Sequence, residues 1–426
     1  MTKEFTRASL TAAFAASVGM FVGTTPMIAA TQSIFMSPIS QEFGLSRTII
    51  SLILICAPLT VAFTAPIGGR LMDRFGVRTI VLPVVLLFAF GQLAMSFVTN
   101  AYQVAAVYVV LGLCGAVHTY PAYTKVLSGW FTHRRGLMMG LVIASGSSVG
   151  AILMPQLVRY MMEAYGWRTA FQALAAVVSL WGLPILFLFL REARRETVEI
   201  NGQTSAAPVE GLTRAEALKT RILWTILVSL FLGPFAIYGT VIHAVPMLTE
   251  RGISILAASS AISLFFAGGL VGQLSAGFFL DRVTSPKVAI PFFICAFAGA
   301  VILHTLSHAP TLLLGSMLLG LGQGAELTIA AYFVTRYFGL KGYGAIYGLV
   351  FGAATGGAAL GIFSSGFVYD LAGSYGPMHI ALPLCLAAIP LLIFTLPKYT
   401  FARARPGEGP AAGQDPKQAA AANPTS

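Results

Sequence analysis

Charged residues are scarce in this sequence. Asp, Glu, Lys and Arg make up 10% of its 426 residues, and only 15 residues are acidic. A soluble domain carries about 25% charged residues, so this composition excludes a chain whose main solvent is water. Hydrophobic residues reach 57% instead, which is the first indication of a membrane protein.

Cysteine and the usual catalytic patterns are equally scarce. The four cysteines are separated from one another within apolar stretches, at Cys56, Cys114, Cys295 and Cys385. This spacing predicts small buried side chains and not a disulfide framework or a metal site. The sequence has no P-loop, no cluster of metal ligands and no nucleophile–base arrangement. We therefore expect no cofactor, no ATP and no enzymatic activity.

Long runs without charge are what the sequence has instead. Residues 79–97 carry no charge, and residues 48–71 carry only Arg70, close to their end. About 20 residues at a rise of 1.5 Å cross a hydrocarbon core of roughly 30 Å, and a helix satisfies its own backbone hydrogen bonds there. Although Lys3 and Arg7 precede the first run as in a secretory signal, eleven further runs favour a retained helix. The sequence predicts an all-α membrane protein with twelve transmembrane helices, at about 10–38, 48–71, 79–97, 101–127, 137–161, 168–190, 222–248, 255–280, 288–306, 310–335, 343–369 and 378–397.

The net charge of +11 follows from topology and does not indicate a nucleic-acid partner. If the N-terminus is cytoplasmic, 22 of the 26 Lys and Arg residues lie on the cytoplasmic side. The four that lie outside are Arg47, Arg159, Arg168 and Arg251. Such asymmetry is the positive-inside pattern, and it predicts a multi-pass protein of a bacterial inner membrane with both termini in the cytoplasm.

The twelve spans divide into two halves that repeat each other at an offset of 208 residues. The matched groups are Pro38, Glu42, Gly44 and Ser46 with Pro246, Glu250, Gly252 and Ser254; Gly69, Asp73 and Arg74 with Gly277, Asp281 and Arg282; and Gly112, Leu113, Gly136 and Gly140 with Gly320, Leu321, Gly344 and Gly348. Two parallel six-helix repeats are one plan of secondary transporters. The expected organisation is an N-terminal half over 1–190, a cytoplasmic linker over 191–221, a C-terminal half over 222–400 and a disordered cytoplasmic tail over 401–426.

The loop after the second span carries a specific motif, at Gly69, Leu71, Asp73, Arg74, Gly76 and Arg78. It resembles the G-x-L-x-D-R-x-G-x-R signature of the major facilitator superfamily, and part of it recurs at Gly277, Asp281 and Arg282. The resemblance implies a transporter that works by alternating access. In such a carrier these residues would form a conformational latch that breaks in one state. The alternative is a solvated turn whose arginines only set topology.

Several segments resemble the monocarboxylate and oxalate–formate transporter group within that superfamily. They are residues 130–136 (Trp-Phe-Thr-His-Arg-Arg-Gly), 165–168 (Tyr-Gly-Trp-Arg) and 211–218, together with His243 and Pro246. This resemblance implies a small organic anion, a monocarboxylate, as substrate. The sequence departs from the group in the eighth span, where Gly269 and Gln273 stand at the places of an Asp and an Arg in animal relatives.

Three titratable residues within the spans are candidates for proton coupling. Glu326 is the only acidic residue in the middle of a span. A charge there costs about 2.5–3.5 kcal/mol on insertion scales, so its carboxyl favours the neutral form and can exchange a proton or hydrogen-bond a substrate. His118 holds the equivalent repeat position, and both would face a central cavity if the repeats are symmetric. His243, near the outer end of the seventh span, suits a gate. A structural carboxyl and satisfied packing histidines are the alternatives.

An anionic substrate calls for a cation, and Lys125 and Arg159 are the candidates within the spans. Both can instead snorkel to the membrane interface. Further side chains expected to line a pocket are Gln32, Tyr120, Tyr123, Tyr238, Gln273 and Tyr332.

The resulting hypothesis is a monomeric, proton-coupled carrier of a small organic anion, with Glu326 carrying the proton and Lys125 or Arg159 attracting the carboxylate. A carboxylate/carboxylate exchanger and a drug or metabolite efflux antiporter are the nearest alternatives. A non-transporting nutrient sensor and a membrane enzyme are less consistent with a chain that lacks a long structured extension and catalytic clusters.

Overall fold

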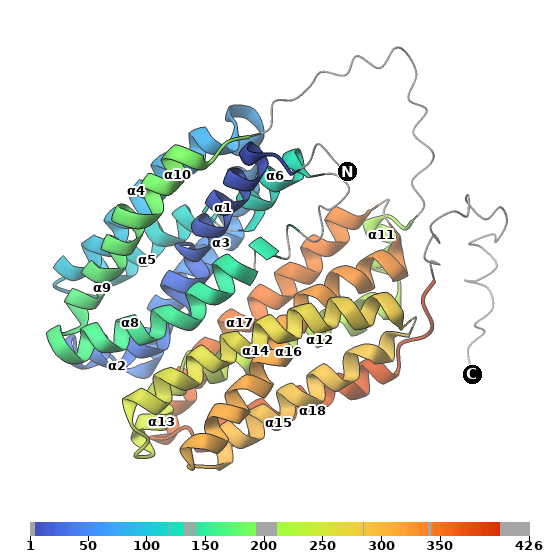
Figure 1. Cartoon of the computed structure of the whole chain (residues 1–426). Coiled ribbons are helices and arrows are strands. Elements are labelled where there is room, and N and C mark those ends of the chain that lie inside the picture. Colours follow the sequence, from blue (N-terminus) through green and yellow to red (C-terminus); the bar gives the residue numbers. More distant parts are fainter. Residues whose placement is uncertain are drawn as a thin grey trace.

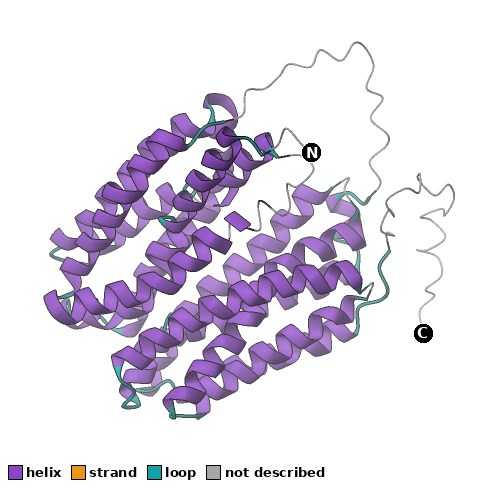
Figure 2. Ribbon diagram, viewed as in Figure 1, coloured by secondary structure: helices purple, strands orange, loops and turns teal. Residues whose placement is uncertain are grey.

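The computed structural model describes residues 5–118, 120–131, 138, 141–142, 144–192, 211–283, 285–339 and 342–400. The described part is helical, without β-strands (Figure 2). Much of the expected linker and the whole expected tail lie outside it, as do His133, Arg134, Arg135 and Gly136 of the motif between the fourth and fifth spans.

The helices fall into two consecutive groups. The N-terminal group comprises α1 (Arg7–Phe21), η1 (Thr25–Ala29), α2 (Gln32–Glu42), α3 (Arg47–Phe75), α4 (Val77–Ala94), η2 (Met95–Phe97), α5 (Ala101–Gly115), α6 (Tyr120–Trp130), η3 (Ala144–Ser148), α8 (Val149–Tyr165), α9 (Trp167–Ala176), η4 (Val177–Gly182) and α10 (Leu183–Phe189). After the short α11 (Arg214–Ala217), the C-terminal group comprises α12 (Arg221–Val241), α13 (Ala244–Glu250), α14 (Ile255–Arg282), η5 (Pro286–Ala289), α15 (Ile290–Thr305), α16 (Ala309–Phe338), α17 (Tyr343–Ala372) and α18 (Gly376–Phe394).

Ten described helical segments are long and apolar enough to cross a membrane. The other two expected spans consist of shorter helices, α5 with α6 and η3 with α8. The break between α5 and α6 has a local cause, because Pro121 has no N–H to donate to the carbonyl of Val117. Large apolar side chains such as Phe63 and Leu180 are 77% and 78% exposed. Soluble proteins rarely expose apolar surface over so many helices. The protein is therefore an integral, multi-pass membrane protein.

The internal repeat is visible in the local geometry of α3 and α14. Ser46 and Ser254 are their N-caps, and each side chain accepts a hydrogen bond from the third residue of its helix at 3.3 Å. Gly44 and Gly252 precede these caps with φ of 61° and 80°, a conformation that favours glycine. The matched Gly and Ser residues thus start equivalent helices.

The two groups form two helical halves that lie against each other (Figure 1). We call the end with α2, α13 and the start of α3 the far end, and the end with α11 the linker end. Between the halves, α17 packs against α3, α14 against α8, and α13 against α2. The α3–α17 and α14–α8 contacts are related by the repeat.

Glycines allow two neighbouring helices, α14 and α16, to touch along their backbones. A Cβ at Gly268 would collide with the carbonyl of Met317, and one at Gly324 would collide with the carbonyl of Gly269. Small residues at such contacts let membrane helices approach closely. This contact fixes the position of Glu326, which follows Gly324 on the same helix.

Candidate functional site

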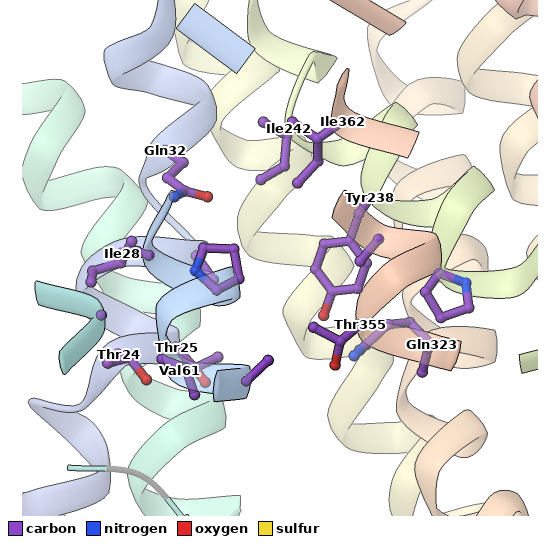
Figure 3. A pocket seen from close by; sticks show the side chains of 18 of the residues that line it. Thr24, Thr25, Ile28, Gln32, Val61, Tyr238, Ile242, Gln323, Thr355 and Ile362 are labelled. Atoms are coloured by element: carbon purple, nitrogen blue, oxygen red, sulfur yellow. The ribbon is translucent and has the colours of Figure 1, made fainter. Parts of the chain in front are cut away.

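A cavity of about 260 Å³ lies between the two halves (Figure 3). Its lining is mostly apolar and comes from both halves. The N-terminal half contributes Thr24, Thr25, Ile28, Ala29, Gln32, Ala57, Pro58, Val61, Ala62, Leu111 and Gly112. The C-terminal half contributes Pro234, Tyr238, Ile242, Gln323, Glu326, Leu327, Phe351, Ala354, Thr355, Ala358 and Ile362.

Among the sequence candidates, the structure brings Gln32, Tyr238 and Glu326 together in this cavity. The amide Nε2 of Gln32 donates to the carbonyl of Leu54 at 3.2 Å, which leaves the amide oxygen pointing toward the opposite half in Figure 3. The hydroxyl of Tyr238 lies beside the amide of Gln323. The cavity therefore offers amide, hydroxyl and carboxyl groups on an otherwise apolar wall.

Glu326 is the only acidic residue of the described lining, and its side chain is 3% exposed. Its Oε1 has no hydrogen-bond partner among the described residues. This oxygen faces Gly233 of α12, where an added Cβ would lie 2.7 Å away. Buried polar atoms are seldom left unpaired. The unpaired oxygen of Glu326 can therefore bind a proton or form a hydrogen bond with a ligand.

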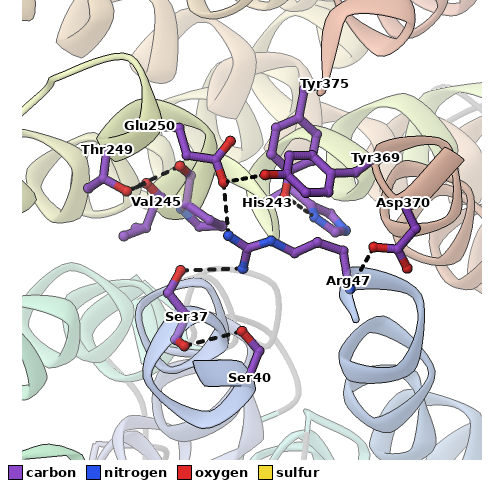
Figure 4. Close-up of polar contacts among 11 residues, drawn as sticks. Ser37, Ser40, Arg47, His243, Val245, Thr249, Glu250, Tyr369, Asp370 and Tyr375 are labelled. Atoms are coloured by element: carbon purple, nitrogen blue, oxygen red, sulfur yellow. Dashed lines mark hydrogen bonds and ion pairs between the residues drawn. The ribbon is translucent and has the colours of Figure 1, made fainter. Parts of the chain in front are cut away.

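The far end of the molecule is closed by polar contacts between the halves (Figure 4). Arg47 of the N-terminal half donates to Glu250 at 2.9 Å, and Tyr369 donates to the same carboxylate at 3.0 Å. Asp370 accepts the backbone N–H groups of Arg47 and Thr48 at 2.9 and 2.7 Å, and the Thr48 hydroxyl at 2.5 Å. We call these five residues the far-end clasp.

His243 is buried next to the far-end clasp and does not line the cavity. Its Nε2 lies 3.0 Å from the carbonyl of Ile362, which only accepts hydrogen bonds, so Nε2 carries the proton. Nδ1 is then free to accept from the Tyr375 hydroxyl at 3.0 Å, and Ser51 of the other half lies 3.3 Å from Nε2. His243 thus joins the two halves just beyond Ile242 and Ile362, which do line the cavity.

His118 also lies outside the main cavity. Of the two residues expected to face a central cavity, His118 and Glu326, only Glu326 does so. Pro26 has no N–H for the carbonyl of Val22, and His118 Nε2 fills that role at 3.0 Å. Its Nδ1 accepts from the Tyr123 hydroxyl at 2.6 Å. The ring is satisfied as a neutral side chain on the wall of a smaller pocket that shares Thr24 and Thr25 with the cavity.

The remaining polar candidates point elsewhere. Tyr120 pairs with Ser147 at 2.9 Å beside the smaller pocket. Tyr332 lies near the linker end, with the Arg336 guanidinium 5.7 Å from its ring centre. Gln273 is half-buried on α14 and is not part of the lining.

Neither candidate cation lines the cavity. Lys125 Nζ donates to the carbonyl of Met72 near the linker end at 2.9 Å. Arg159 pairs with Glu163 at 2.6 Å toward the far end of α8. Lys125 thus reaches the last turn of α3 and Arg159 the last turn of α8, as snorkelling residues do.

The expected latch is only partly described, since the side chains of Asp73 and Asp281 lie outside the described residues. Gly76 has φ of 86° and ends α3. The backbone N–H of Arg78 donates to Glu192 at 3.0 Å and its guanidinium to the carbonyl of Phe187 at 2.7 Å.

The other described members of the latch also make local contacts. The guanidinium groups of Arg74 and Arg282 lie over the rings of Phe75 and Phe278. A Cβ added at Gly69 or Gly277 would meet none of the described neighbours within 4 Å. The latch function stays a prediction.

Sequence reasoning missed Gln323, Thr355 and the acceptors of the far-end clasp. Gln323 lies one helical turn before Glu326, so helical spacing would have placed both on one face. Glu250 was noticed only as a repeat position. No local signal relates Asp370 to Arg47, which precedes it by 323 residues.

Comparison with known proteins adds four findings. The model of the Major Facilitator Superfamily matches residues 9–306 and 235–424. The chain is 28% identical over 342 residues to monocarboxylate transporter 13 of Bos taurus, covering 79% of this chain and 78% of that protein. It is 25% identical over 398 residues to the 4-hydroxybenzoate transporter PcaK of Pseudomonas putida, covering 84% of this chain and 87% of that protein. The solved structure of the nucleoside transporter NupG superposes with a TM-score of 0.73 at 12% identity, over 91% of this chain and 99% of that chain, and so shares its fold.

Proposed function

This chain belongs to the Major Facilitator Superfamily and is a transporter, not an enzyme, and from that premise we propose that it carries a small organic anion together with a proton. The anion is a monocarboxylate. The two halves alternate between states that open the cavity to opposite sides of the membrane, as in other carriers built from repeated halves.

The observation that carries this proposal is the buried carboxyl of Glu326 in the cavity between the halves. A side chain that is 3% exposed and keeps an unpaired oxygen can change its protonation state when a ligand arrives. Intramembrane ionisable residues are expensive to bury and commonly mark ion or proton pathways. Glu326 is therefore the proton carrier in this proposal.

Two observations support a monocarboxylate. The named substrates of two relatives, monocarboxylates and 4-hydroxybenzoate, each carry one carboxyl group. The cavity of about 260 Å³ is mostly apolar, which suits a small acid with an apolar body better than a polyhydroxylated one. Lys125 and Arg159 no longer serve as substrate ligands in the proposal, because they lie outside the cavity lining.

We assign the linker end to the cytoplasm of a bacterial inner membrane because 22 of the 26 basic residues belong to that side. The structure then corresponds to a state closed toward the outside by the far-end clasp. The latch at Asp73 and Asp281 would close the cytoplasmic side in the opposite state.

Uptake of labelled lactate, benzoate and 4-hydroxybenzoate into proteoliposomes, with and without an inward proton gradient, tests the proposal. We expect gradient-driven accumulation of at least one acid in the wild type. Glu326→Gln should abolish accumulation but retain exchange of internal for external acid, since an amide cannot release a proton. Glu163→Gln, the same change at an exposed site on α8, is the matched control.

Uptake that is unchanged both by the proton gradient and by Glu326→Gln would contradict proton coupling and favour the carboxylate exchanger. Movement of none of the acids would contradict the substrate class.

A further inference from the structure

The cavity poses a physical problem for an anionic substrate. None of the described residues that line it is Lys, Arg or His. An unpaired carboxylate against such an apolar lining would lose several kcal/mol of hydration without compensation. The negative charge of the substrate must therefore be met by hydrogen-bond donors or by a proton.

Three donors are available on the wall formed by the C-terminal half. Gln323 and Glu326 are one helical turn apart on α16, and both line the cavity. Tyr238 of α12 presents its hydroxyl beside Gln323 (Figure 3). Protonated Glu326 has an O–H to give, and because Gly233 of α12 has no Cβ, the carboxyl can pack directly against that helix.

Other titratable groups of the neighbouring elements do not compete for this role. Tyr238 is the only other titratable side chain in the described lining. On α15, His304 is engaged by Thr240 and His379 at 2.9 and 2.7 Å. The remaining lining from η1, α2, α3, α5 and α17 consists of threonines, Gln32, glycine and apolar residues.

We propose that the substrate carboxylate binds directly to protonated Glu326 through one shared proton, with the Gln323 amide and the Tyr238 hydroxyl as further donors and no cationic partner. This assignment rests on the proposed function. Two carboxyl groups in contact cannot both be ionised. Instead they share one proton, as in other paired carboxyl sites. The coupled proton is thus part of the substrate site.

One consequence is a fixed stoichiometry: one proton enters with each carboxylate, and it leaves Glu326 when the acid is released. A second consequence concerns neutral analogues. A carboxamide has the same shape as the acid and can exchange hydrogen bonds with Glu326 in either protonation state, so it should compete with the acid. A site built on Lys or Arg would reject it.

Binding to the purified full-length chain in nanodiscs tests this assignment. The dissociation constants of lactate, benzoate and 4-hydroxybenzoate, and of lactamide, benzamide and 4-hydroxybenzamide, would be measured from pH 5.5 to 8.5. For wild type, we expect carboxylate affinity to fall about tenfold per pH unit above the pH at which Glu326 ionises, as binding of one linked proton requires. Carboxamide affinity should change much less.

In Glu326→Gln, the acid should still bind, with an affinity that varies by less than about twofold over the pH range. Glu326→Asp, which keeps a titratable group, should retain the pH dependence, and Glu163→Gln should behave as wild type. Tyr238→Phe and Gln323→Leu should each weaken carboxylate binding by about tenfold or more, the usual cost of losing a hydrogen bond to a charged group.

An unchanged pH dependence in folded Glu326→Gln, or acids that bind while their amides do not compete, would overturn the assignment. Failure of every acid to bind or be transported by wild type would instead overturn the proposed function.

Discussion

Arg47 in the N-terminal half donates to Glu250 in the C-terminal half at 2.9 Å, across the boundary between the two halves. Glu42, the repeat equivalent of Glu250, pairs with Arg168 of its own half at 2.6 Å. One duplicated acidic position thus serves two purposes. Glu250 holds the halves together, whereas Glu42 anchors α2 to α9 within one half. This difference provides matched variants for testing the far-end clasp.

Glu250→Gln should increase the population that is open at the far end. The pair is partly exposed, at 14% and 38% of its side chains, and such pairs contribute about 0.2–1 kcal/mol. We expect the open population to rise by up to about fivefold. Electron–electron distances between spin labels at Tyr165 and Leu371, both exposed at the far end, measure it in a background without the native cysteines. Glu42→Gln should leave these distances unchanged, and an equal response of both variants would contradict the assignment of Glu250.

Asp370→Asn should loosen the start of α3 more than Glu250→Gln does. Asp370 accepts two backbone N–H groups in the first turn of that helix, where a negative charge contributes about 0.3–2 kcal/mol. Hydrogen exchange at Arg47 and Thr48 should become faster, by up to about 30-fold. Glu163→Gln is the control for a general charge effect. Exchange as slow as in the wild type would show that Asp370 does not hold the two halves together.

Gly324→Val should destabilise the C-terminal half. The new side chain would meet the backbone of Gly269, which cannot move aside without displacing α14, and overpacking typically costs about 1–3 kcal/mol or more. We expect a lower midpoint in thermal unfolding and weaker carboxylate binding, because Glu326 shifts with α16. At Gly348 a Cβ would meet none of the described residues within 4 Å, so Gly348→Ala should change stability by less than about 1 kcal/mol. Comparable losses in both variants would contradict this packing account.

Lowering the pH should remove the contribution of Glu42 to the stability of the protein. The hydrogen bond from Arg168 is the main cause that lowers the pKa of Glu42 below 4.5. A lowered folded-state pKa means that the stabilisation is complete above about pH 4.5 and is lost as the pH falls through the folded value. For this exposed pair we expect about 1 kcal/mol at most. The thermal stability of wild type and Glu42→Gln should differ at pH 7 and converge as the pH falls through the lowered pKa of Glu42, and a constant difference would refute this linkage.

Much of the architecture follows from the sequence because it depends on features that are local along the chain. Uncharged runs fix where helices cross the membrane, because the hydrocarbon core accepts apolar side chains and requires the backbone to pair its own polar groups. Ser46 and Ser254 start equivalent helices because an N-cap needs only its own turn. Glu326 stood out because a lone carboxyl in an apolar span is conspicuous wherever the helix packs.

The tertiary structure decided the partners of each polar group, because those depend on helix breaks and on contacts distant in sequence. Because Pro26 has no N–H, the carbonyl of Val22 is available to His118, which donates to it. His118 therefore does not line the cavity, although it holds the repeat position equivalent to Glu326. Lys125 donates to the carbonyl of Met72 in the last turn of α3 instead of reaching the cavity, since a cation favours the membrane interface. The pairing of Glu250 with Arg47 arises only when the halves meet, and the sequence around either residue carries no trace of it.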